Sequence, residues 1–358
     1  MRILIVSSRS APRLLSDVNA FDFEDAVLDA AGADLLVPGG DQSALAPRYD
    51  LIIVTGISFR AVADLTRRIE AEGGLPDAGR RIAYVLGGYG SAVIAQGRRM
   101  RQIARWLSGN WPGRFRRFDC VYLGIPDEAE PIGTALGVPI RYLPMAANVL
   151  PVQARPFHSR ADRPIAVVAP GRQHGAIVDA ICDRLNHPGS DDLALRYNPF
   201  DSSLQALPRY RAMFWQILRQ SRVLMAFDHN YANPARREVL SHVGPRWFEA
   251  YAAGTVVAGR GPDTAEAATL LDWPDAYIEI ADDPQAAAQQ VAELLADEAR
   301  LRAASRRNLA EVHARHDWRH RLDMLLQMEG LQSPAALQAQ LQQLHTRAEA
   351  LRASAEAA

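Results

Sequence analysis

Positions 244–261 read GPRWFEAYAAGTVVAGRG and bring an acid and a base together in a run of small and aromatic residues. Glu249 lies on the helical turn predicted to lead into Gly254, and Arg246 lies one turn earlier. A carboxylate at this point can accept hydrogen bonds from a pair of ligand hydroxyls, and an arginine can hold an anion through its planar fork. An ordinary solvated helix face would contain the same two residue types, so the surrounding sequence has to distinguish the two interpretations.

A glycine and an arginine follow the predicted buried strand 165–169. Gly171 would let the backbone approach a phosphate at the N-terminus of the next helix, and Arg172 would supply a fork for a diphosphate. A simple turn with a surface arginine explains the pair equally well.

Polar residues also follow the predicted strand 223–227, where His229 and Asn230 come directly after Asp228. Because parallel strands end at the same edge of a sheet, we expect these side chains to lie near Gly171. There they can contact a base or a sugar, or form an ordinary Asx turn.

The string Arg-x-Phe-Glu-Ala-x-Ala-x-Gly followed by a strand resembles the donor-site signature of group-1 GT-B glycosyltransferases. More narrowly, it resembles the spore-maturation-like subset. The resemblance implies that Glu249 binds the ribose of a nucleotide sugar, that Gly254 and its small neighbours let backbone amides approach it, and that Gly171 and Arg172 form the first donor loop. It further implies a UDP- or GDP-sugar donor, a hydroxyl acceptor, a retaining reaction and no metal or other cofactor.

Two positions depart from the family pattern. Ser241 stands where the commonest pattern has a second glutamate that contacts the transferred sugar, and Asn148 stands where an acid is more frequent. Either another group contacts the sugar, or the donor sugar differs.

The first half of the chain is expected to bind the acceptor. Ser8 and Arg9 end the first predicted strand, and Gly88 and Tyr89 follow strand 81–86. The glycine cluster 87–90 lacks the spacing of a dinucleotide-binding loop, and no acid follows about twenty residues later, so NAD is not expected. No catalytic base can be named from the sequence.

Residues 98–118 mix arginines with tryptophans and phenylalanines and contain no acid until Asp119. Such a stretch can lie on a membrane surface or meet a lipid-linked or anionic acceptor. Arginines and aromatics can also clamp single-stranded nucleic acid. The alternative is a solvated helix whose tryptophans point into the core.

Three histidines, His313, His316 and His320, recur at helical spacing and could ligate zinc. The better interpretation is the late helix found near the end of such transferases, in which the aromatic residue packs and the charges face water. We expect no metal site.

The elements that position these residues follow an alternating pattern. Apolar runs at 2–7, 50–55, 81–86 and 120–124 alternate with helical segments, and the pattern resumes at 165–169 after a proline-containing stretch. Repeated strand and crossover predict doubly wound parallel sheets. The fold class is therefore α/β of the GT-B type, with two Rossmann-like domains facing a central cleft and a C-terminal helical tail. The expected ranges are 1–150 for the acceptor domain, 151–163 for a linker, 164–330 for the nucleotide-sugar domain and 331–358 for the tail.

Composition fits this reading. The 358 residues are 48% hydrophobic and 23% charged, with a net charge of −1, so no global field attracts nucleic acid and none is expected as a partner. Every basic residue is arginine, so phosphates must be held by arginine forks or backbone amides. Cys120 and Cys182 have no metal-type or redox-type spacing, which favours a cytoplasmic protein that can also touch the inner face of the membrane through 98–118.

The tail carries leucines at alternating spacings of four and three between 334 and 352, which predicts either pairing with a second copy or packing on the body. Two other functions share this architecture. A nucleotide-sugar epimerase would need no acceptor, and a non-catalytic GT-B scaffold would bind no nucleotide.

Overall fold

The computed structural model describes residues 1–12, 14–43, 45–87, 111–126, 133, 136–171, 173–197, 206–232 and 241–356. The chain forms two compact units. Among the described residues, the first contains Met1–Met145 and Trp318–Leu341, and the second contains residues 146–317 and 342–356.

The first unit is built on a six-stranded parallel sheet in the order β2-β1-β3-β4-β5-β6. Its strands are β1 (Ile3–Val6), β2 (Asp34–Leu36), β3 (Arg48–Gly56), β4 (Asp77–Val85), β5 (Cys120–Leu123) and β6 (Ile140–Tyr142). The central strands are unbroken apolar runs because helices cover both faces of the sheet. Its helical elements are the 3₁₀ turn Leu15–Asp17, α1 (Val18–Ala31), α2 (Phe59–Ala71), α5 (Trp111–Phe115) and α14 (Trp318–Met328).

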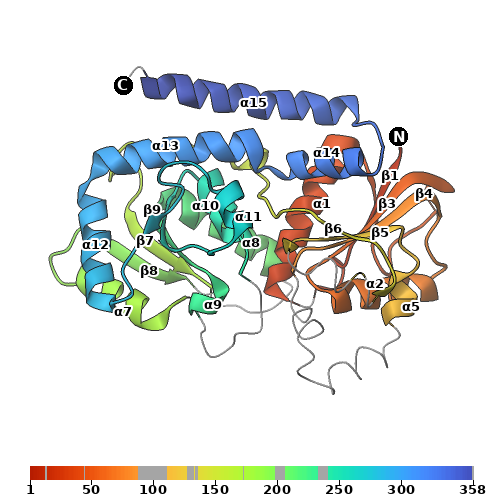
Figure 1. Ribbon diagram of the computed structural model, residues 1–358, viewed down its shortest axis with the longest axis horizontal. Coiled ribbons are helices and arrows are strands. Elements are labelled where there is room, and N and C mark those ends of the chain that lie inside the picture. The colour runs from red at the N-terminus through yellow and green to blue at the C-terminus, as the bar shows by residue number, and fades with distance from the viewer. Residues whose placement is uncertain are drawn as a thin grey trace. The chain divides into compact units, whose positions relative to one another are not determined.

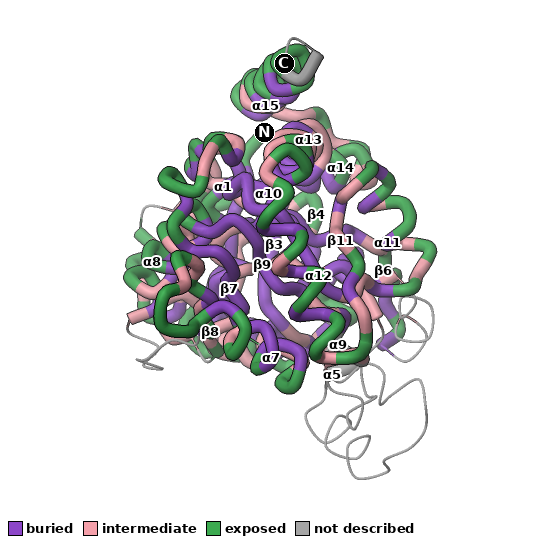
Figure 2. Tube along the Cα trace, turned by 90° about the vertical axis from the view of Figure 1, so that its left-hand side faces the viewer, coloured by how far each residue is buried: buried purple, intermediate pink, exposed green. Residues whose placement is uncertain are grey.

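The second unit has a five-stranded parallel sheet in the order β11-β10-β9-β7-β8. Its strands are β7 (Ile165–Pro170), β8 (Leu193–Tyr197), β9 (Ser221–Phe227), β10 (Val256–Arg260) and β11 (Ile278–Glu279), and Figure 2 shows β7 and β9 as buried. Its helices are α7 (Gly175–Leu185), α8 (Leu207–Gln220), α9 (His229–Ala232), α10 (Pro245–Ala252), α11 (Ala265–Leu270), α12 (Pro284–Ala296) and α13 (Glu298–Arg315), with a 3₁₀ turn at Leu150–Val152.

In both sheets the second and third strands lie on opposite sides of the first strand. The second strand lies on one side of β1 or β7, and the third strand, β3 or β9, lies on the other. The crevice at the carboxyl ends of two such strands is where doubly wound folds bind ligands. Each unit therefore has one switch point, and the predicted α/β fold class with two doubly wound domains is confirmed.

The division of the chain differs from the ranges expected from the sequence. The boundary falls after Met145, and α14 belongs to the first unit, although residues up to 330 were assigned to the second domain. The reason is an aromatic contact. Trp318 is 1% exposed and packs edge-to-face against Phe23 at 5.5 Å and Tyr84 at 6.2 Å between ring centroids, both in the first unit.

The terminal helix α15 (Ala335–Glu356) has its first residues in the first unit and the rest, from Gln342, in the second. The four-and-three spacing falls on Leu337, Leu341, Leu344, Ala348 and Leu351, and all of these except Leu341 are at most 5% exposed. The second part of the helix runs alongside α13 (Figure 1). These positions thus pack on the body of the protein, and pairing with a second copy stays a prediction.

The basic stretch 98–118 is described only from Trp111. Phe115 and Phe118 are buried in the core of the first unit, and Arg114 and Arg117 pair with Glu70. Membrane contact through this stretch stays a prediction, since residues 98–110 lie outside the described part. Within that part, none of the helices combines the length and apolarity that crossing a bilayer would require.

Replacing Trp318 by alanine should destabilise the first unit. Loss of this buried ring leaves a cavity beside Phe23 and Tyr84, and such losses cost about 3–5 kcal/mol. Urea unfolding followed by circular dichroism measures the effect. Met324→Ala is the matched control, since Met324 lies on the same helix with 39% of its surface exposed and should change stability by less than about 1 kcal/mol. Equal losses in the two variants would show that α14 is not held by Trp318.

Candidate functional site

The carboxyl edge of the second sheet is shaped by the turn after β7. Gly171 has φ of 72°, a left-handed conformation that side chains rarely adopt, and its amide donates to the carbonyl of Tyr197 at 3.3 Å. The turn leads into α7, whose first amides have no partner within the helix. Gly171 thus forms a left-handed turn at the switch point, and its role in phosphate binding stays a prediction.

Gln173 joins the two strands that flank this switch point. Its side-chain amide donates to the carbonyl of Pro170 at 2.8 Å and to that of Met225 at 3.1 Å. Its Oε1 and the neighbouring Nδ1 of His174 are buried and have no hydrogen-bond partner among the described residues. The His174 ring lies 5.3 Å from that of Tyr231. Buried polar atoms of this kind are costly unless a ligand or water satisfies them.

Glu249 is held between two arginines. The carboxylate is 1% exposed, with Oε1 2.6 Å from Nη1 of Arg211 and Oε2 accepting from Nη1 of Arg246 at 2.6 Å. Arg211 comes from α8 and is 11% exposed, whereas Arg246 comes from the first turn of α10 and is 32% exposed. The predicted neighbours Arg246 and Glu249 are thus brought together, as an ion triad with a third residue.

The electrostatics of Glu249 are set by two opposing effects. Burial would raise the pKa of this carboxyl, but the charges and hydrogen bonds of Arg211 and Arg246 outweigh it and hold the pKa below its ordinary value of 4.5. Glu249 is therefore an anion at neutral pH, with each oxygen facing a cation.

Aromatic rings form a wall beside the triad. Tyr197, at the end of β8, stacks on Tyr210 with ring centroids 5.8 Å apart, and Arg246 lies over Phe214 at 4.4 Å. Burial raises the pKa of Tyr197 to about 12, with Tyr210 adding to the rise and Arg246 opposing it. The Tyr197 hydroxyl is buried and has no hydrogen-bond partner in the described part of the chain. These planar rings and the guanidinium of Arg246 form a surface on which a flat ligand group can stack.

Asp228 follows β9 and is 6% exposed. Its Oδ2 accepts a hydrogen bond from the hydroxyl of Ser241 at 2.9 Å. Ser241 is the position at which the family pattern has a second glutamate. The structure therefore places a carboxylate beside the position from which one is missing.

Three predicted site residues, Arg172, Gly88 and Tyr89, lie outside the described residues. His229 and Asn230 are described only as backbone, at the start of α9 directly after β9. Gly254 lies at the opposite end of α10 from Arg246, next to the amino end of β10. A Cβ there would lie 2.7 Å from the carbonyl oxygen of Arg155 and 2.8 Å from Nη2 of Arg163, so packing alone accounts for this glycine.

The switch point of the first unit contains a cavity of about 220 Å³. Ser8 lines it, together with Ile57 and Ser58, which follow β3. Arg9 does not line it. Its guanidinium pairs with Glu24 at 2.8 Å and Asp25 at 2.7 Å.

Glu24, the partner of Arg9, is fully buried. It accepts hydrogen bonds from Ser7 at 2.6 Å and from Thr55. Burial raises its pKa above the ordinary value, although Arg9 and the two hydroxyls oppose the rise. Glu24 therefore supports the local structure by joining Ser7, Thr55 and Arg9.

The histidines of the zinc alternative lie in packed positions. His316 stacks on Phe248 with ring centroids 4.8 Å apart, and Nδ1 of His313 lies 2.7 Å from the carbonyl oxygen of Leu309. Among the described residues, no three potential ligands are grouped as a metal site would require.

The second sheet thus has an Arg–Glu–Arg ion triad at its carboxyl edge, and the sequence of this region matches a known family. Residues 187–327 match the sequence model of a family described as glycosyl transferase-like. The matched range contains Arg211, Asp228, Arg246 and Glu249. The match covers much of the second unit and continues into α14, and the predicted resemblance to GT-B glycosyltransferases is confirmed. The narrower resemblance to the spore-maturation-like subset stays a prediction.

Solved structures similar to this chain have the same fold. Sucrose-phosphate synthase from Thermosynechococcus elongatus matches with a TM-score of 0.54 and 13% identity over 92% of this chain and 98% of its own. HepE from Anabaena, in complex with UDP and glucose, matches with a TM-score of 0.53 and 11% identity over 92% and 99% of the two chains. An alpha-glucosyltransferase in complex with UDP and DNA matches with a TM-score of 0.53 and 10% identity over 92% and 98% of the two chains. None of the curated proteins matches the chain.

Sequence reasoning missed several residues of this site. Arg211 lies far from the motif along the chain, and Tyr197 ends a short strand that was not predicted. His174 offered the best signal, because it directly precedes the helix that was expected to hold a phosphate.

Replacing Glu249 by glutamine should leave two arginines facing an uncharged amide. Breaking a buried ion pair in this way costs about 3–5 kcal/mol at neutral pH. A depressed pKa contributes stability above the unfolded value of 4.5, and that contribution is lost as the pH falls through the folded value. The gap between wild type and variant should therefore stay constant from pH 8 to about pH 5 and shrink below it.

Urea unfolding at each pH measures this gap. Glu329→Gln is the control, because Glu329 is also a little-exposed carboxylate paired with an arginine, Arg141, but in the first unit. A gap that is small at pH 7, or that grows on acidification, would contradict the triad.

Proposed function

We propose that the protein transfers a sugar from a UDP- or GDP-sugar to a hydroxyl acceptor, with the donor bound at the carboxyl edge of the second sheet. The observation that carries the proposal is the Arg211–Glu249–Arg246 triad, which lies within the matched family segment and beside the Tyr197–Tyr210 stack. Similar structures were solved with UDP or UDP and glucose, which supports this donor class.

The triad suggests how the donor is received. Arg211 is nearly buried, whereas Arg246 is partly exposed on the first turn of α10, so Arg246 is the partner that can leave. We infer that ribose hydroxyls replace Arg246 at Oε2 of Glu249, while Arg211 keeps the carboxylate neutralised. Arg246 then pairs with the donor diphosphate.

The leaving diphosphate would be stabilised by Arg246 and by the N-terminus of α7 behind Gly171, as fixed positive groups stabilise charge that develops in a transition state. No metal is invoked in this scheme. We propose retention at the anomeric carbon, and the anomeric coupling constant of the product in an NMR spectrum distinguishes retention from inversion.

Asp228 is proposed to contact the transferred sugar. Its carboxylate lies beside Ser241, the position at which the family pattern has a glutamate, and the hydrogen bond between them fixes its orientation. The acceptor is proposed to enter at the cavity of the first unit that Ser8 lines.

Replacing Arg246 by glutamine should weaken donor binding and transfer more than it affects folding. Loss of one charged contact to the leaving group typically costs on the order of 100-fold in rate. Calorimetric titration with UDP, GDP and their sugars gives the affinity, and release of nucleotide gives the rate. Arg211→Gln should instead lower stability, because Arg211 is the buried partner. Arg300→Gln, which breaks the exposed pair with Asp275, is the neutral control.

Absence of nucleotide binding by the wild type would favour the scaffold, and conversion of the donor to another nucleotide sugar without acceptor would favour the epimerase.

Replacing Asp228 by asparagine separates sugar contact from nucleotide contact. Affinity for UDP or GDP alone should be unchanged, whereas affinity for the matching nucleotide sugar should fall about tenfold, equivalent to about 1.4 kcal/mol. Ser241→Ala, which removes the orienting hydroxyl, should give a smaller change in the same direction. Equal weakening of both ligands would remove Asp228 from the sugar site.

A further inference from the structure

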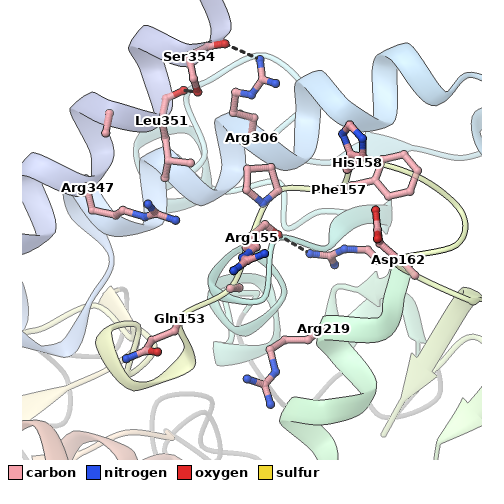
Figure 3. Close-up of a pocket in the computed structure, with 14 residues that line it drawn as sticks. Gln153, Arg155, Phe157, His158, Asp162, Arg219, Arg306, Arg347, Leu351 and Ser354 are labelled. Carbon is pink, nitrogen blue, oxygen red and sulfur yellow. Dashed lines mark hydrogen bonds between the residues drawn. The ribbon is translucent and has the colours of Figure 1, made fainter.

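A second cavity, of about 790 Å³, lies at the opposite edge of the second sheet (Figure 3). Its lining includes Arg163, just before β7 begins, and Arg219, just before β9 begins. It therefore faces the amino ends of the strands, whereas the triad and Tyr197 lie at their carboxyl ends. The other walls are the linker around Arg155, the helix α13 and the terminal helix α15. All of these segments belong to the second unit.

The lining is strongly basic. It contains a histidine, His158, a single acid, Asp162, and five arginines: Arg155, Arg163, Arg219, Arg306 and Arg347. None of the five arginines forms an ion pair with any residue that the structure describes, although most arginines elsewhere in this part of the chain do. Like charges brought together without a counterion repel one another, so the cavity favours an anion.

One of these arginines is fixed in place. Arg163 is 4% exposed, and its guanidinium donates to the carbonyls of Ser221, Arg155 and Ala253 at 2.7–2.8 Å. Burial lowers its pKa to about 10, with Asp162 opposing the shift only in part. The bond to the Arg155 carbonyl also holds the linker in position. Arg163 is thus a rigid positive charge in the wall of the cavity, bound to carbonyls and to no carboxylate.

The other four arginines come from four different segments. In Figure 3, Arg306 of α13 and Arg347 of α15 lie above Arg155 of the linker, and Arg219 of α8 lies below. Arg155, Arg219 and Arg347 are exposed, and the only hydrogen bonds of Arg219 and Arg306 among described residues go to the carbonyls of Val152 and Ser354. Their guanidinium groups can therefore turn toward a common ligand without breaking an ion pair.

We propose that this cavity binds a small ligand that carries two or more phosphate groups. Planar guanidinium forks match phosphate oxygens in a bidentate manner, and arginines on several sides of a cavity need an anion with several charges. The volume lies in the range of small-molecule sites, and Phe157 and Leu351 provide apolar walls for the rest of the ligand. A soluble diphosphate ester and the head group of a diphosphate-bearing lipid share this chemistry.

Such a ligand would also join α15 to the rest of the second unit. Arg347, Leu351 and Ser354 belong to α15, whereas Arg155 and Arg219 belong to the linker and α8. A ligand contacting both groups would hold the terminal helix against the linker, so its binding should slow hydrogen exchange in residues 342–356.

Calorimetric titration of the full-length protein with inorganic pyrophosphate tests the proposal. The wild type should bind one equivalent at this site, and the double variant Arg155→Gln/Arg347→Gln should bind at least tenfold more weakly, because two exposed forks are lost. Arg48→Gln/Arg67→Gln is the matched control, since both arginines are exposed and neither forms an ion pair with a described residue. Arg246→Gln separates this site from the donor site. If Arg246→Gln abolished pyrophosphate binding and Arg155→Gln/Arg347→Gln did not, pyrophosphate would bind at the donor site, and the proposal would be overturned.

Sedimentation with vesicles distinguishes the two ligand sources. One set of vesicles contains phosphatidylcholine alone, and the other also contains cardiolipin. If the ligand is soluble, the wild type and the Arg155→Gln/Arg347→Gln variant should bind equally to each set. If cardiolipin vesicles retain the wild type but not this variant, while pyrophosphate does not bind, the ligand is a lipid head group. Failure of both probes, or affinities that do not depend on Arg155 and Arg347, would overturn the proposal. Because the donor-binding test rests on Arg246 and Glu249, the two proposals can fail separately.

Discussion

The candidate site depends on the neutralisation of one buried carboxylate. Glu249 has almost no contact with solvent, and a charge in such a place is unfavourable unless cations and hydrogen bonds compensate it. The compensation comes from two helices, because Arg211 belongs to α8 and Arg246 to α10. Helix α8 leads into β9 and helix α10 leads into β10, so one ion triad joins the helices that precede two neighbouring strands. The carboxyl edge of the sheet is then positioned by an interaction that is itself part of the site.

The protein contains no lysine, so arginine supplies its permanently cationic side chains, and the geometry of arginine explains how buried positions are used. The Arg163 guanidinium satisfies three backbone carbonyls at once, which the compact ammonium group of lysine would not do in the same plane. Arg321 likewise donates to the carbonyls of Pro144 and Met145 at the end of the first unit's main segment. In both places a planar donor satisfies carbonyls at a loop or strand end, where no helix or sheet partner is available.

The sequence predicts the architecture well because buried parallel strands are continuous apolar runs. Strands such as Ile3–Val6 and Ile165–Pro170 are therefore visible without any knowledge of their neighbours. Leu193–Tyr197 was missed because it mixes apolar and charged residues, as an edge strand with one exposed face does. The place of α14 was missed for another reason. Trp318 packs in the first unit against Phe23 and Tyr84, which lie nearly 300 and more than 200 residues earlier in the sequence. The periodicity of a helix gives no information on contacts between such distant residues.

The same distinction applies to the site. Local spacing brought Arg246 and Glu249 together, since residues three apart on a helix are neighbours. It could not supply Arg211, whose contact with Glu249 spans a strand and two helices, nor the hydrogen bond between Ser241 and Asp228. These long-range partners change the interpretation of the motif. Taken alone, Glu249 is an acid that awaits ribose hydroxyls. Within the triad both of its oxygens already face cations, so the donor binding that we propose requires an exchange of partners. Exposure decides which partner is exchanged, because separating Arg246 from Glu249 moves a guanidinium that already contacts water, whereas separating Arg211 would leave a buried cation unpaired.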